Sequence, residues 1–249
     1  MTDVLLSFKV RGDFANFRDE SVTTSHITYV IPPRTTIIGL IASILGIERG
    51  NKFKRNEIEG LYTKEYIDLS KSIKVGIKVL NKRINKINIV TNHVSFVRRQ
   101  VKPFKIELLE NPNYEIFVLG EKSKLELIKK VIDNSEYKYT PFLGNAYCLA
   151  TISDAKIFDS FEEVPNPNRK FTSAAIINQG NFMLQPKSDN DEVIVENHLY
   201  FISPDKKLTV EFWAPIGGDG RFEIRDYEDK NDLGLKFVEI DNKEIICMF

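Results

Sequence analysis

The sequence predicts an α+β fold with a ferredoxin-like order of elements, followed by a region built from strands alone. Three observations lead to this prediction. Apolar and polar residues alternate in residues 4–11, 73–80 and 114–119, as they do in half-buried strands. Residues 34–45 and 122–132 carry apolar residues at helical spacing. Beyond residue 150 the periodic segments have strand character, and none is typical of a helix.

The first strand leads into a polar loop. Within residues 4–11 the apolar side chains lie on one face, and the other face becomes basic toward its end. Residues 13–25 form the polar loop, and residues 26–31 are short and β-prone. We therefore expect an extended segment directly before the first helix.

The first helix has clear start and stop signals. Proline suits the position before or at a helix start, and Pro33 precedes the expected helix of residues 34–45. Gly46 fits a C-terminal cap. Because the helix is apolar on most sides, we expect it to be buried, with Gly39 and Ala42 allowing close packing on a sheet.

The following hundred residues continue the alternation of helix and strand. The order β-α-β-β-(β)-α is close to a ferredoxin-like topology. The expected elements are a helical region at 51–69, strands at 73–80, 87–97, 106–109 and 114–119, and an amphipathic helix at 122–132.

Two structural units are expected. Residues 1–150 would form the ferredoxin-like domain, with a β-hairpin near residues 73–105. Residues 151–249 would form a small C-terminal antiparallel β meander. The run Pro165-Asn166-Pro167-Asn168 is typical of a linker between elements.

Charge is distributed very unevenly. The formal net charge is zero, but residues 1–105 hold 19 Lys and Arg against 9 Asp and Glu, and residues 106–249 hold 16 against 26. Residues 69–105 contain ten basic residues and no acidic one. A solvated strand face would also explain this run. A nucleic-acid surface is favoured because the run coincides with the expected hairpin.

Several function classes find no support in the sequence. The two cysteines, Cys148 and Cys247, are far apart and indicate neither a disulfide framework nor a zinc site. The most apolar run, residues 35–47, is too short to cross a bilayer, so the expected location is the cytoplasm. No P-loop, Rossmann or metalloprotease motif is present, and neither a metal nor another cofactor is expected.

The loop and helix start around residues 14–39 offer groups that bind a nucleic-acid backbone. A helix N-terminus attracts phosphate through its unpaired N–H groups and its dipole, and Arg34, Thr35 and Thr36 lie there. Aromatic rings in the same segment could stack on unpaired bases. These rings could equally pack under the loop as core. The aromatic residues are Phe14, Phe17 and Tyr29.

Three separated motifs resemble one known family. The first combines A-N-F-R (15–18), T-T-S-H-I-T-Y (23–29) and P-P-R-T-T-I-I-G-L (32–40). The others are E-L-L (107–109) with N-P-N-Y (111–114), and Y-T-P-F-L-G (139–144). Together they resemble the fifth Cas protein family, a RAMP-superfamily subunit of the type I CRISPR effector complex (Cascade). The form of the last motif is most similar to the subtype I-B branch.

This resemblance implies a fold and a set of partners. The fold would be a ferredoxin-like RAMP domain with a protruding β-hairpin thumb. The subunit would cap the crRNA at its 5′ repeat-derived handle, in antiviral defence, and would pack against the Cascade backbone and large subunits. A contact with target DNA near the protospacer motif stays open. The expected RNA-binding residues are Arg11, Phe14, Phe17, Arg18, Thr24, Ser25, His26, Tyr29, Arg34, Thr35, Thr36, Arg83, Lys86, Arg98, Arg99 and Lys102.

Two alternatives are kept. In one branch of the resembling family the subunit is a metal-independent endoribonuclease that processes pre-crRNA, and His26 with Tyr29 would then supply the acid and base. In the other alternative the basic surface docks only a protein. A non-catalytic role is favoured, with no catalytic residue assigned. The glycine-rich run at residues 217–220 is interpreted as a hairpin turn.

Overall fold

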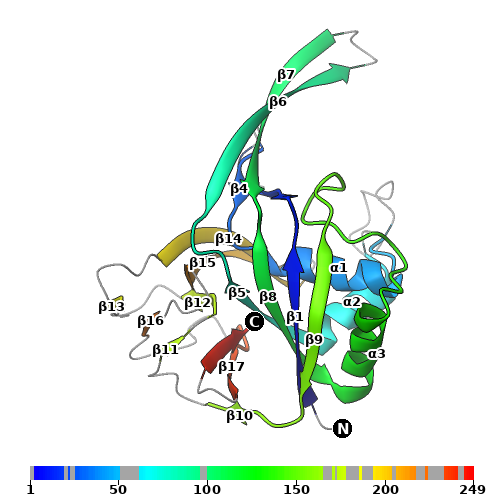
Figure 1. Ribbon diagram of the computed structural model, residues 1–249, viewed down its shortest axis with the longest axis vertical. Coiled ribbons are helices and arrows are strands. Elements are labelled where there is room, and N and C mark those ends of the chain that lie inside the picture. Colours follow the sequence, from blue (N-terminus) through cyan, green and yellow to red (C-terminus); the bar gives the residue numbers. More distant parts are fainter. Residues whose placement is uncertain are drawn as a thin grey trace.

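A computed structural model gives the arrangement of the chain (Figure 1). It describes residues 3–19, 22, 26–50, 62–95 and 100–164, and shorter stretches beyond them. Those stretches are residues 170–171, 173–177, 185–186, 193–203, 206–216, 222–223, 233–240 and 244–249.

A four-stranded sheet forms the centre of the molecule. Its strand order is β5-β8-β1-β9, and each neighbouring pair is antiparallel. The strands are β1 (Asp3–Arg11), β5 (Ile73–Val79), β8 (Asn113–Glu121) and β9 (Thr151–Phe158). With α1 following β1 and α3 following β8, the chain makes two split β-α-β units. This confirms the predicted α+β class with a ferredoxin-like order.

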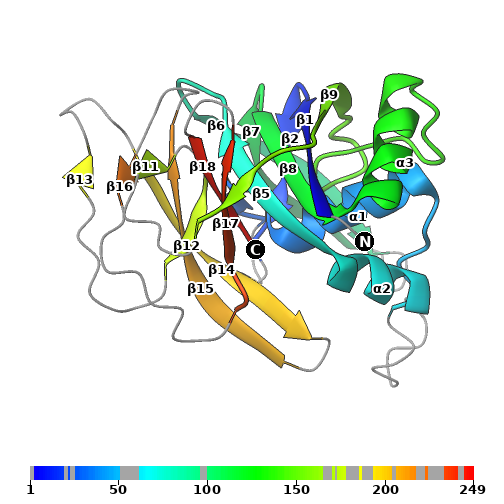
Figure 2. The same ribbon diagram turned by 90° about the horizontal axis from the view of Figure 1, so that it is seen from below.

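Helices cover one face of this sheet (Figures 1 and 2). They are α1 (Arg34–Leu45), α2 (Lys64–Ser72) and α3 (Lys122–Asp133). The first ends where the sequence indicates, because Gly46 adopts φ +78° and its N–H bonds back to the last turn. In α2 the side chain of Thr63 accepts from the N–H of Tyr66 as a cap. Part of the helical region expected at 51–69 lies outside the described residues.

The opposite face of the sheet is partly covered by the C-terminal hairpin. Strands β17 (Lys236–Ile240) and β18 (Glu244–Met248) pair with each other and form a second apolar cluster with Leu5, Phe117 and Phe158. A Cβ on Gly76 would lie 2.6 Å from a methyl carbon of Ile246, so this approach requires glycine. The domain division at residue 150 stays a prediction, although the central sheet continues to Phe158.

A long hairpin projects from the central sheet (Figure 1). It consists of β6 (Asn85–Ser95) and β7 (Gln100–Glu110). The expected hairpin near residues 73–105 was therefore placed wrongly at its start. The strand that begins at Ile73 is β5, which pairs with β8 in the central sheet. Its residues are buried on both faces, which suits a strand inside the molecule and not one arm of a projecting hairpin.

The C-terminal region differs from the expected meander. One sheet has the order β12-β15-β14 and another the order β10-β17-β18-β11-β16-β13, with β11 parallel to β18. A meander pairs only consecutive strands, so that prediction was wrong. The strands are β10 (Glu162–Glu163), β11 (Lys170–Phe171), β12 (Ala175–Ile177), β13 (Gln185–Pro186), β14 (Val193–Ser203), β15 (Lys206–Pro215) and β16 (Phe222–Glu223).

Three two-residue strands complete the fold near the base of the hairpin. They are β2 (Phe14–Ala15), β3 (Phe17–Arg18) and β4 (Thr28–Tyr29). The first pairs with β7, and the other two pair with each other. Within the described ranges, no helix is both long enough and apolar enough to span a membrane.

Candidate nucleic-acid interface

The loop before α1 is bound tightly to the base of the hairpin. The N–H of His26 donates to the carbonyl of Lys105, and the N–H of Glu107 donates to the carbonyl of His26. The carboxylate of Glu107 accepts from the N–H of Thr28 at 3.2 Å. Its carbonyl accepts from the side-chain amide of Asn16 at 2.7 Å. The first two sequence motifs therefore form one hydrogen-bonded unit.

The third motif joins the same unit. The N–H of Asn16 donates to the carbonyl of Leu143, and the side-chain amide of Asn145 donates to the side-chain oxygen of Asn16. Gly144 has φ +86°, and a Cβ there would lie 1.9 Å from the carbonyl oxygen of Asn16. Glycine is therefore required at this contact. Residues that lie about 130 positions apart in the sequence meet at one place.

Arg34 has a structural role at the N-terminus of α1. Its Nη2 donates to the carbonyls of Ser70 and Ile73 at 2.6 and 3.1 Å, and its Nε donates to the carbonyl of Phe249 at 3.2 Å. The guanidinium thus joins the end of α2, the start of β5 and the last residue of the chain. This geometry contradicts the expected phosphate contact by Arg34, because its donors point into the protein.

The aromatic residues of the loop have different environments. Phe17 is 1% exposed and packs edge-to-face on Tyr114, so the expected stacking of Phe17 on a base is wrong. Tyr29 donates its hydroxyl to Asp19, and its ring lies 4.1 Å from that of His198. Phe14 is 38% exposed in β2 and keeps a surface that a base could contact.

His26 is held by its backbone and by a ring contact. Its imidazole lies edge-on to Phe104 with 4.5 Å between the ring centroids. Tyr29 is engaged by Asp19 and His198. Because the contacts described for His26 and for Tyr29 are with different residues, they give no support for the two acting together as acid and base in RNA cleavage. Thr24 and Ser25 lie outside the described residues.

A groove of about 660 Å³ lies between α1 and the loop of the third motif. One wall is a face of α1 that includes Thr35, Thr36 and Gly39. Tyr139, Phe142 and Gly144 of the third motif also line it, together with Arg18. Three expected binding residues, Arg18, Thr35 and Thr36, therefore line one cavity. Its volume is within the range of sites for small organic ligands.

The remaining basic candidates lie on the projecting hairpin, in the segment just before it and at the end of β1. Arg83 and Lys102 are exposed, and Arg11 is exposed where β1 ends. Lys86 is partly neutralised, because its ammonium donates to the Glu107 carboxylate at 3.0 Å and to the carbonyl of Thr28 at 2.9 Å. Arg98 and Arg99 lie outside the described residues.

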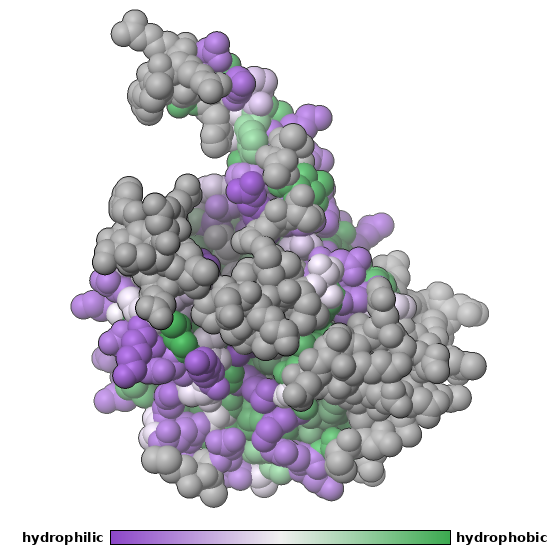
Figure 3. All heavy atoms as spheres, turned by 180° about the vertical axis from the view of Figure 1, so that it is seen from behind, coloured by the Kyte–Doolittle hydropathy of each residue, from purple (hydrophilic) through white to green (hydrophobic). Residues whose placement is uncertain are grey.

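Both faces of the hairpin carry polar and apolar residues. In the antiparallel register Val94 lies opposite Val101, and Val90 lies opposite Lys105. All three valines are at least 55% exposed. The other face carries Lys102 and, two residues along the strand, Phe104, which lies opposite Thr91. Figure 3 shows hydrophilic and hydrophobic residues side by side on this projection.

A largely buried carboxylate, that of Glu196 in β14, positions the segment before α1. Its two carboxylate oxygens accept from the N–H groups of Val30 and Ile31 at 2.7 and 2.9 Å. His198 lies 3.2 Å from the same carboxylate. The Tyr114 hydroxyl donates to the carbonyl of Val30 at 2.6 Å. Sequence reasoning missed Glu196 because nothing in the local pattern of its strand indicates a partner 165 residues earlier.

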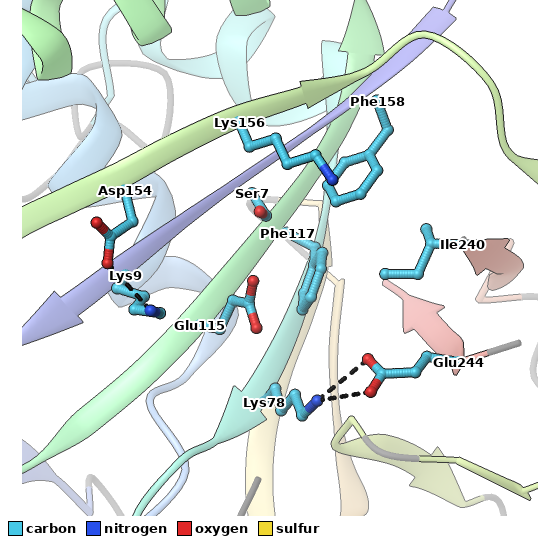
Figure 4. Close-up of a pocket in the computed structure, with 10 residues that line it drawn as sticks. All are labelled: Ser7, Lys9, Lys78, Glu115, Phe117, Asp154, Lys156, Phe158, Ile240 and Glu244. Carbon is cyan, nitrogen blue, oxygen red and sulfur yellow. Dashed lines mark hydrogen bonds and ion pairs between the residues drawn. The ribbon is translucent and has the colours of Figure 1, made fainter. Parts of the chain in front are cut away.

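A second pocket of about 370 Å³ opens on the sheet face that β17 and β18 leave uncovered (Figure 4). Lys78 and Glu244 form a salt bridge there at 3.1 Å, and Lys9 pairs with Asp154 at 3.0 Å. Burial raises the pKa of the Glu115 carboxyl, although the positive charge of Lys78 opposes this shift. Because its charges are largely paired with one another, this pocket shows no net preference for phosphate.

Comparisons with known proteins give a family. A family model described as CRISPR-associated protein (Cas_Cas5) matches residues 5–213. No curated protein matches the sequence.

Solved structures give more distant similarities. A chain of a "CRISPR RNA-guided surveillance complex" has 14% identity and a TM-score of 0.47, over 94% of this chain and 98% of that one. A chain of the "Type III-B Cmr-beta bound to cognate target RNA and AMPPnP" has 12% identity and a TM-score of 0.43, over 90% of each chain. The structure "Crystal structure of Cas protein" has 18% identity and a TM-score of 0.38, over 58% of this chain, which spans 59% of that one.

Proposed function

The chain belongs to the CRISPR-associated protein (Cas_Cas5) family, and on this premise we propose that it is the crRNA-binding subunit of a type I CRISPR effector complex. It caps the 5′ repeat-derived handle and does not cut RNA. One observation carries the proposal. Three motifs converge on a single hydrogen-bonded unit, which joins a basic hairpin to a groove along α1.

Electrostatics support RNA as the ligand. The basic first part of the chain supplies the exposed cations Arg11, Arg18, Arg83 and Lys102 on or beside this unit. RNA phosphates release counterions when such cations bind them, so affinity falls steeply with salt. The backbone and large subunits of the complex are the proposed protein partners, and subtype I-B is the proposed branch.

The test compares two double substitutions with the same change of charge. Arg83→Ala with Lys102→Ala removes two exposed cations, one in the segment just before β6 and one on β7. Lys122→Ala with Lys130→Ala removes two exposed cations on α3, and is the control. Binding of labelled single-stranded repeat RNA is measured by fluorescence anisotropy over a range of salt concentrations.

The hairpin variant should bind more weakly, and its slope of log K against log salt should be smaller by about 1 to 2. The control should keep the slope of the unmodified protein. Equal slopes in all three proteins would show that Arg83 and Lys102 do not contact RNA phosphates. If the unmodified protein, alone and with its partner subunits, ignores repeat RNA at low salt, the proposed function is wrong.

A further inference from the structure

Packing against the described residues does not explain why position 39 of α1 is a glycine. A Cβ added there meets no heavy atom of the described residues within 4 Å. The sequence-based expectation that Gly39 allows close packing on the sheet is therefore wrong, because that face of α1 points away from the sheet. Glycine disfavours a helix interior, so its presence suggests a close approach by something other than the protein itself.

The open face at Gly39 is a wall of the α1 groove. Residues three and four apart lie on one side of a helix, and Thr35, Thr36, Gly39 and Ser43 form such a stripe facing the groove. The hydroxyls of Thr35 and Thr36 make no hydrogen bond within the described ranges. The helix therefore offers a flat strip of backbone bordered by polar groups.

The other walls supply rings and a cation. Tyr139 and Phe142 line the groove and are 48% and 38% exposed. Arg18 is exposed and lines the groove, as does Asn145. Exposed rings, an arginine and unpaired hydroxyls are the groups with which proteins hold splayed bases of single-stranded RNA.

From these observations we infer that the groove holds one unpaired ribonucleotide of the bound RNA, with its flat base or ribose against the helix backbone at Gly39. The inference rests on the proposed RNA-binding function and assigns one position within it. A purely phosphate-binding surface would not need an open glycine or exposed rings. A double-stranded RNA would not present an unstacked base to a groove of about 660 Å³.

The test fills the groove without harming the helix. Gly39→Ala and Gly39→Gln place good helix formers on α1, so the melting temperature should stay the same or rise. Leu127→Gln is the matched control, because Leu127 is 53% exposed on α3 and receives the same side chain. Affinity for labelled single-stranded RNA is measured by anisotropy at several salt concentrations.

Gly39→Gln should weaken RNA binding about tenfold, the loss expected when one stacked base is displaced. Gly39→Ala should have a smaller effect, and Leu127→Gln none. The salt slope should be unchanged in all three variants, because the phosphate contacts remain. RNA carrying 4-thiouridine should crosslink to a peptide that contains Tyr139 or Phe142, and mass spectrometry locates the adduct.

Other outcomes separate the two ideas. If the Gly39 variants bind RNA like the unmodified protein and crosslinks fall only on the hairpin, the groove assignment is wrong and the RNA-binding function stands. If they bind RNA normally but fail to assemble with partner subunits, the groove holds a protein segment. If the unmodified protein binds no RNA, both ideas are overturned.

Discussion

Removing the carboxylate of Glu196 should destabilise the protein strongly. This side chain is 13% exposed and accepts two hydrogen bonds from backbone N–H groups, those of Val30 and Ile31. Val30 is 6% exposed and Ile31 is fully buried, so water cannot easily replace the lost acceptor. A hydrogen bond to a charged group contributes about 1.5–3 kcal/mol, and a buried donor left without an acceptor is penalised further.

Two such bonds give an expected loss of about 3–5 kcal/mol for Glu196→Ala. Glu196→Gln keeps one carbonyl acceptor and should lose about half as much. For a chain of 249 residues, about 3–5 kcal/mol corresponds to a fall in melting temperature of roughly 6–20 °C. Unfolding in urea, followed by circular dichroism, measures both variants.

Glu163→Ala is the control for this experiment. Glu163 also forms an ion pair, with Lys236, but its side chain is 53% exposed. An exposed pair contributes only about 0–1 kcal/mol. If Glu196→Ala is no more destabilising than Glu163→Ala, the carboxylate does not hold the segment before α1 and the reasoning is refuted.

Three further predictions concern other residues. Gly144→Ala should be several times more destabilising in thermal melts than Gly234→Ala; both have positive φ, but only the first would clash with backbone. Because burial raises the pKa of Glu115, its unfavourable effect on folding appears as pH rises above the ordinary value of 4.5. Glu115→Gln should therefore gain stability in urea unfolding at neutral pH, and this gain should shrink on acidification; a constant gain would contradict the shift. Repeat RNA incubated with the protein in EDTA should stay intact on a denaturing gel, and site-specific cleavage that His26→Ala abolishes would contradict the non-catalytic assignment.

Local signals in the sequence predict α1 and α3 well, whereas α2 runs from Lys64 to Ser72 instead of ending at residue 69. Helix α1 begins after Pro33 and ends before Gly46 as expected, because both signals act on neighbouring backbone groups. The hairpin was harder to predict. The alternation of apolar and polar residues identifies β5 as a strand, but it does not indicate which strand pairs with it. That strand is β8, and not β6 as expected.

The roles of side chains were likewise predictable where they depend on neighbouring residues, and not where they depend on residues distant in the sequence. The sequence named Arg18, Thr35 and Thr36 among the RNA-binding residues; all three line the groove, and their contact with RNA stays a prediction. It could not predict that Arg34 points inward, because the carbonyls that it contacts come from residues 36 to 215 positions away. Glu196 was missed for the same physical reason, since the N–H groups that donate to it come near only when β14 lies beside the loop.

The residues that carry the family resemblance mostly bind one another. Asn16, Thr28 and Glu107 use their polar groups within the loop and hairpin base, and Arg34 uses its donors on buried carbonyls. Neutralising Arg34 would therefore break contacts that join α1 to the end of α2, the start of β5 and Phe249, and a loss of RNA binding would not identify a contact. Because exposed cations and Gly39 are not needed by the described fold, substitutions there separate binding from folding. The interface is best probed at residues that the described fold does not use for its own contacts.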